Sequence, residues 1–88
     1  MSEIEIKKEK QTEKGWEFEV EFEGDSFNVS LDKEYWKKLT GGNQSQGDLV
    51  TKSFEFLLER EPKEFILKSF DLRIIGKYFP EYEAVLKN

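Results

Sequence analysis

The sequence predicts an α+β protein in which an N-terminal antiparallel β-hairpin or three-stranded meander is packed by three to four short C-terminal helices. Between Trp16 and Leu31, apolar and polar residues alternate, which is typical of half-buried strands. In the C-terminal half, apolar residues recur at helical spacing, and Pro62 and Pro80 divide this half into short segments. Because the strands come first, the helices follow and no linker separates them, we expect one domain over residues 1–88.

The alternation predicts a register for the hairpin as well as its place. We expect strands at about 16–23 and 26–31, joined by a two-residue loop at Gly24-Asp25. A further strand at about 3–8 shows the same alternation, and whether it joins the sheet is left open. With this loop, six apolar residues of one face pair across the hairpin: Phe22 with Phe27, Val20 with Val29 and Phe18 with Leu31.

Capping residues and proline mark four helical segments after the hairpin. Asp32 and Ser45 are predicted N-caps of the first two helices. Pro62 stops the second helix and suits the first position of a third, and Asp71 is the predicted N-cap of the last. The predicted helices lie at about 33–40, 46–60, 62–69 and 72–79.

The composition argues against most catalytic chemistry. The chain has no histidine and no cysteine, which removes thiolate and imidazole nucleophiles, the usual zinc sites and disulfides. Its serines therefore have no histidine to activate them. We expect no enzyme activity, no catalytic residue, no metal site and no cofactor.

The charge and hydropathy of the chain indicate which partners and compartment to expect. Nineteen acidic residues against fourteen basic ones give a net charge of −5, which repels phosphate backbones and anionic membranes. Nucleic acid is therefore not an expected partner. No apolar run approaches the roughly 20 residues that span a bilayer, and the N-terminus has no apolar signal segment. We expect a cytoplasmic protein that does not associate with membranes.

A row of glutamates along the first hairpin strand is the most unusual local feature. Alternate strand positions place carboxylates roughly 6.5–7 Å apart, close to the phosphate spacing along one nucleic-acid strand. The row is a candidate acidic face that mimics nucleic acid. The alternative, which the pattern favours, is a solvated outer sheet face whose charge discourages aggregation. The residues are Glu17, Glu19, Glu21 and Glu23.

Four aromatic residues of the helical half are candidate partner-binding residues: Trp36, Phe56, Tyr78 and Tyr82. Phe56 lies off the apolar stripe of its predicted helix, and Tyr78 precedes another aromatic residue. Exposed aromatic side chains serve as anchors for protein partners. The alternative is that neighbouring helices cover these side chains, with the Tyr82 hydroxyl reaching solvent.

Residues 27–61 resemble the ribbon-helix-helix family. The resemblance rests on the strand FNVSL, the helix DKEYWKKL, the turn TGGNQSQG and the helix DLVTKSFEFLLERE. It implies a dimeric DNA-binding regulator or antitoxin whose strand pairs with that of its dimer mate and reads the major groove. The outward strand positions are Asn28, Ser30 and Asp32, of which Asn28 is the base-reading candidate.

A second resemblance covers roughly residues 53–83. The combination of FLLEREP, FDL and YFPEYE is similar to small prokaryotic proteins of about this length that are described as uncharacterised. This resemblance implies a stand-alone protein and brings no activity with it. Our main hypothesis is a non-catalytic cytoplasmic module that binds a protein partner or self-associates, for example as a dimer. The alternative is a ribbon-helix-helix-like dimeric DNA-binding regulator or antitoxin.

Overall fold

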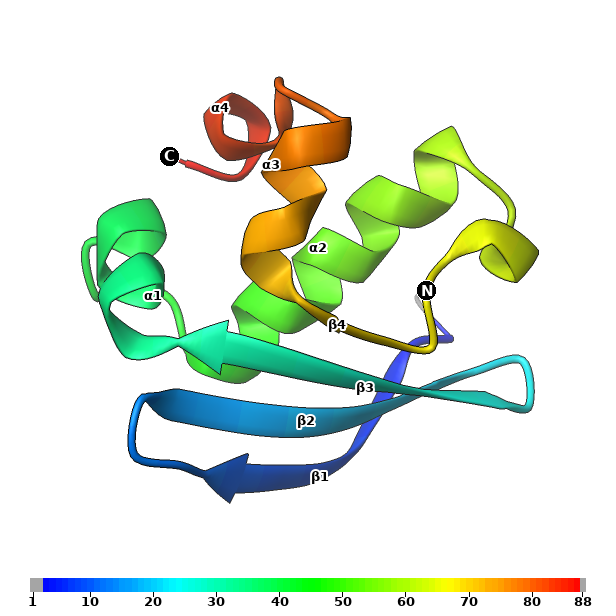
Figure 1. The fold of residues 1–88 in the computed structure, drawn as a ribbon, viewed down its shortest axis with the longest axis horizontal. Helices are drawn as coiled ribbons and strands as arrows, with labels where there is room; N and C mark the ends of the chain where they lie inside the picture. The colour runs from blue at the N-terminus through cyan, green and yellow to red at the C-terminus, as the bar shows by residue number, and fades with distance from the viewer. Residues whose placement is uncertain (1–2, 88) are drawn as a thin grey trace.

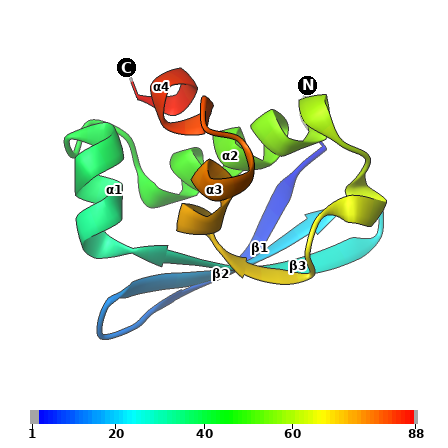
Figure 2. The same ribbon diagram turned by 45° about the horizontal axis from the view of Figure 1, so that its top comes forward.

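The computed structural model describes residues 3–87 and confirms the α+β class (Figure 1). A four-stranded sheet has the order β1-β2-β3-β4. The helices gather on one face of this sheet, and the other face stays open (Figure 2). The strands are β1 (Glu5–Gln11), β2 (Gly15–Phe22), β3 (Asp25–Asp32) and β4 (Ser69–Asp71). The helices are α1 (Lys33–Thr40), α2 (Gln46–Arg60), α3 (Ile75–Tyr78) and α4 (Tyr82–Leu86), with 3₁₀ turns η1 (Lys63–Phe65) and η2 (Leu72–Ile74).

The β2–β3 hairpin forms where the alternation predicts it, but the predicted register is wrong by two residues. The turn residues are Glu23 and Gly24, with φ of 52° and 84°. Positive φ at both positions is typical of a type I′ turn, whose twist matches that of the strands. Phe22 therefore lies opposite Asp25. The shift is even, so the apolar residues keep the helix-covered face. The observed pairs are Val20 with Phe27, Phe18 with Val29 and Trp16 with Leu31.

The N-terminal strand β1 joins the sheet at its edge, antiparallel to β2, which settles a point that the sequence leaves open. Its register shifts between Ile6 and Lys8, so that Lys7 lies in a β-bulge. Ile6, opposite Val20, packs against the core. A bulge and lysines on an edge strand discourage further strand pairing there.

The predicted helix at 62–69 is wrong. A single 3₁₀ turn follows Pro62, and the chain then extends into β4, which pairs parallel with β3 so that Phe70 lies opposite Val29. The Asn28 backbone N–H also donates to the Lys68 carbonyl at 2.7 Å. A short apolar run fits a buried helix or a buried strand, and here pairing with a distant strand decides the outcome.

The first two helices have the predicted bounds, and their caps form as expected. The Asp32 carboxylate accepts a hydrogen bond from the Tyr35 N–H at 3.0 Å, and Ser45 Oγ accepts one from the Asp48 N–H at 3.1 Å. The predicted helix at 72–79 is split into the 3₁₀ turn η2 and the short helix α3. The next helix, α4, packs on α2 and α1.

The hydrophobic core lies between the sheet and the helices. Phe27 of β3 and Phe54 of α2 are fully buried, and their rings meet edge to face with centroids 5.0 Å apart. Trp16 and Trp36 pack edge to face at 5.5 Å, against the core. Such aromatic pairs add about 0.5–1.5 kcal/mol beyond the area that they bury.

We expect Gly24→Ala to destabilise the protein by about 1–2 kcal/mol, because only glycine adopts φ of +84° without strain. No atom lies within 4 Å of the added Cβ, so the loss would come from backbone conformation alone. Urea unfolding measures it. Gly76→Ala in α3 is the control and should gain about 0.5–1 kcal/mol. Equal effects of the two substitutions would contradict the positive-φ turn.

Candidate functional site

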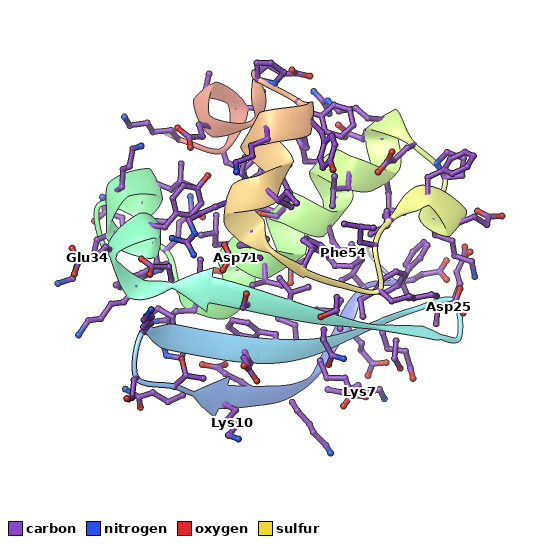
Figure 3. All side chains as sticks on the ribbon, in the orientation of Figure 1. Lys7, Lys10, Asp25, Glu34, Phe54 and Asp71 are labelled. Atoms are coloured by element: carbon purple, nitrogen blue, oxygen red, sulfur yellow. The ribbon has the colours of Figure 1, made fainter. Side chains whose placement is uncertain are left out.

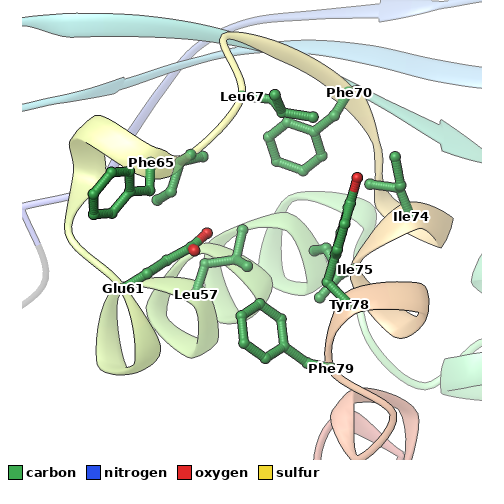
Figure 4. A pocket seen from close by; sticks show the side chains of 10 residues that line it. Leu57, Glu61, Phe65, Leu67, Phe70, Ile74, Ile75, Tyr78 and Phe79 are labelled. Atoms are coloured by element: carbon green, nitrogen blue, oxygen red, sulfur yellow. The ribbon is translucent and has the colours of Figure 1, made fainter.

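An apolar groove lies between two segments of the C-terminal half, with α2 as its floor (Figure 4). One wall comes from residues 65–70 and the other from residues 74–79, while Leu57 and Glu61 line the floor. The cavity has a volume of about 440 Å³. All of the lining side chains except Glu61 are apolar or aromatic.

The walls of this groove carry large apolar side chains that solvent reaches. Phe65 is 71% exposed, Tyr78 67% and Leu67 51%. Within residues 3–87, the other strongly exposed large apolar side chain is Val85, at 52%, and it does not line the groove. A contiguous exposed apolar patch marks an interaction site, whereas a single exposed side chain needs no explanation.

The backbone explains why Phe65 and Leu67 are exposed. Ile66 is only 4% exposed and packs into the core. From Ile66 the backbone is extended, with φ of −81° and ψ of 129°. Because neighbouring side chains point to opposite sides of an extended chain, burial of Ile66 turns its neighbours outward. Three consecutive apolar residues in a non-helical segment are therefore the sequence signal for this wall, which our sequence analysis missed.

Glu61 gives the groove a negative end. Its side chain is half-buried and its carboxylate points between the walls (Figure 4). No ion pair or side-chain hydrogen bond of Glu61 occurs within the described residues, whereas Arg60 pairs with Glu81 at 3.0 Å and Lys63 with Asp25 at 3.1 Å. The residue follows directly on the C-terminus of α2, where the helix dipole is also negative.

Of the four aromatic candidates, Tyr78 lines the groove, and the structure places the others elsewhere. Phe56 and Tyr82 are 3% and 0% exposed, so their prediction as surface anchors is wrong. The Arg60 guanidinium lies 3.6 Å from the centroid of the Phe56 ring, and Tyr82 packs edge to face against the same ring. Trp36 is half-buried and donates its Nε1–H to a backbone carbonyl.

The hydroxyl of Tyr82 does not reach solvent, as the alternative interpretation would have it. It lies 2.6 Å from Ser53 Oγ in a fully buried pair that joins α4 to α2. Ser53 Oγ also donates to the Leu49 carbonyl at 2.7 Å. Burial raises the pKa of Tyr82 to about 12. Tyr82 is therefore a structural anchor of α4.

The glutamate row lies on the open face of the sheet, but neighbouring lysines of β1 offset its negative charge. Glu17 and Glu19 lie opposite Lys10 and Lys8, and Glu21 forms an ion pair with Lys7 at 3.7 Å. Figure 3 shows Lys10 pointing away from the helices. The nearby carboxylate of Glu21, followed by that of Glu5, raises the pKa of Lys7. The fourth member, Glu23, lies in the hairpin turn and not in the strand. This mixed charge favours the solvated outer face over a phosphate mimic.

The ribbon-helix-helix arrangement does not form. Both edges of β3 are occupied, by β2 on one side and β4 on the other, so no edge is free for a dimer mate. Ser30 donates to an Asp71 carboxylate oxygen at 2.8 Å, and Asp32 caps α1. Asn28 alone of the three outward residues is exposed.

No group of three or more histidine, cysteine, aspartate or glutamate side chains suited to a metal ion occurs in residues 3–87. None of the helices in that span has the length and hydropathy to cross a bilayer. Comparison with protein-family models, with curated proteins and with solved structures gives no match to this chain.

We expect Tyr82→Phe to destabilise the protein by about 1 kcal/mol at neutral pH, because it removes one buried hydrogen bond. The stability of the wild type should also fall between about pH 10 and 12. There the unfolded chain releases the Tyr82 proton while the folded chain, with its raised pKa, still holds it. Urea unfolding at pH 8 and pH 11 measures both effects, with Tyr78→Phe as the exposed control. An equally steep alkaline decline in Tyr82→Phe would contradict this assignment.

On the open sheet face, we expect the charges of Lys8 and Glu19 to interact across the two strands. Glu19→Lys places two lysines opposite each other and should destabilise by about 0.5 kcal/mol, and adding Lys8→Glu should restore the loss. Urea midpoints of the four proteins give the coupling energy, which should shrink in high salt. Additive effects of the two changes would show that this register pair carries no interaction.

Proposed function

We propose that this chain is a non-catalytic cytoplasmic module that binds another protein through the groove between residues 65–70 and 74–79. The observation that carries the proposal is the exposure of Phe65 and Tyr78 on opposite walls of one apolar groove. Large aromatic side chains around a concave apolar centre are the typical anchors of protein interfaces.

The chemistry of the groove supports binding over catalysis. Glu61 is the one ionisable side chain among the described lining residues besides the phenol of Tyr78. The described lining has no second carboxylate, hydroxyl nucleophile or amine to work with Glu61, so it lacks the pairs of groups that most hydrolytic mechanisms use. Binding of a partner, in contrast, needs only the apolar walls and their exposure.

The sequence resemblance fits this function. All of the lining residues fall between Leu57 and Phe79, within the 53–83 stretch that is similar to the small prokaryotic proteins. Exposed apolar side chains are not needed for folding, since the core lies beneath them. A protein that carries such a patch has a surface that can bind a partner.

Site-specific photo-cross-linking tests the proposal. Tyr78 is replaced by photoreactive p-benzoylphenylalanine, and the matched control carries it at Val85, which is also exposed but lies outside the groove. In cells, we expect a discrete cross-linked protein from position 78 and little or none from position 85. Loss of the adduct on adding Phe65→Ser would confirm the groove. No adduct at position 78, or equal adducts at both positions, would contradict the proposal.

A further inference from the structure

We infer that the partner is a basic amphipathic helix, which lays an apolar stripe into the groove and sets a lysine or arginine against Glu61. This inference rests on the proposed function and adds the chemistry of the bound segment. Three features of the groove lead to it: the shape of the walls, the shortness of the strand edge beside them, and the charge at one end.

The backbone of the groove favours a helix over an extended peptide. An added strand needs a sheet edge with free N–H and C=O groups. β4 is an edge strand, but it has only three residues and passes directly into η2, so its unpaired side offers few backbone groups to an added strand. Backbone groups of the walls are also used internally, since the Phe65 N–H donates to Pro62 and the Phe79 N–H to Ile75. The groove therefore offers side-chain contacts, which suit a ligand that satisfies its own backbone.

The size of the groove matches one face of a helix. A helix with its side chains is about 10–12 Å across, so a cavity of about 440 Å³ takes the side chains of one stripe but not the whole helix. Side chains at i, i+3 or i+4 and i+7 form such a stripe. Phe65 and Tyr78, on opposite walls, would then contact the two sides of the stripe.

Charge complementarity indicates that the bound segment is positively charged. Glu61 is the sole charged lining residue in the described part of the chain, and it has no cation of its own. Arg60 and Lys63 are engaged by Glu81 and Asp25. Lys77 is exposed and does not line the groove. An acidic partner would remove the hydrating water from the Glu61 carboxylate and offer no positive charge in exchange. A lysine or arginine of the partner would instead form an ion pair with this carboxylate beside the apolar surface.

A second copy of the chain fits this site less well. Each copy carries a net charge of −5, and an isologous dimer through the groove would bring both Glu61 side chains into one interface. Like charges at a buried interface oppose association. A heterologous basic segment meets neither obstacle.

Binding of two designed peptides tests the inference. Both are helical 18-residue peptides with leucines at i, i+3, i+4 and i+7. One has lysines flanking the stripe, and the other has glutamates at the same positions. We expect the wild type to bind the lysine peptide at least about tenfold more tightly in calorimetry, which corresponds to about 1.4 kcal/mol. NMR chemical-shift changes should map to the groove.

Substitutions at Glu61 and at one neighbour separate the charge from the groove. Glu61→Lys should remove or reverse the preference, and Glu61→Gln should reduce it. Glu64→Lys is the matched control, because Glu64 is exposed nearby and does not line the groove, and it should keep most of the preference. Circular dichroism and thermal unfolding show that each variant is folded.

The outcomes distinguish failure of this inference from failure of the proposed function. Equal affinity for the two peptides, or no change in Glu61→Lys, would overturn the charge assignment and leave the groove as a binding site. A cross-link from position 78 to a protein without a basic helix, or to a second copy, would overturn the partner while the groove stands. No peptide binding and no cross-link would overturn both proposals.

Discussion

The parallel pairing of β4 with β3 is the interaction on which the rest of the C-terminal half depends. Phe70 lies opposite Val29, and the Ser30 hydroxyl donates to the Asp71 carboxylate at 2.8 Å. These contacts hold the chain between η1 and η2 against the sheet. Because this short strand is fixed, residues 65–67 and 74–79 face each other across α2 instead of continuing as one helix. The groove is a consequence of this pairing.

The same pairing decides which apolar side chains are buried. Ile66 enters the core and Phe65 remains 71% exposed, although both residues are large and apolar. On the other side of α2, the buried pair of Ser53 and Tyr82 holds α4 in place, so Phe56 is covered. One side of α2 is therefore closed by α4, and the other is left with an open groove.

Sequence reasoning succeeds where the deciding interaction is local. The caps at Asp32 and Ser45 set the starts of α1 and α2, and strict alternation places Phe18 and Val20 on the buried face. It fails where distant contacts decide. No local signal distinguishes the observed type I′ turn at Glu23-Gly24 from the predicted loop at Gly24-Asp25. The choice between them changes the register of the hairpin by two residues but leaves the apolar side chains on the same face of the sheet. Likewise, Phe56 and Tyr82 are covered only because α4 folds back, and β4 forms only because β3 is there.

The distribution of charge differs between the open face of the sheet and the groove. On the open sheet face, acids and lysines alternate across β1 and β2, so the glutamate row creates little net field there. In the groove, Glu61 has no cationic partner among residues 3–87, although Arg60 and Lys63 lie beside it in sequence. Those cations are directed to Glu81 and Asp25, which tie the ends of α2 and η1 to α4 and the hairpin turn. The net charge of −5 would therefore speed the approach of a basic partner, whereas the single carboxylate in the groove would select how that partner docks.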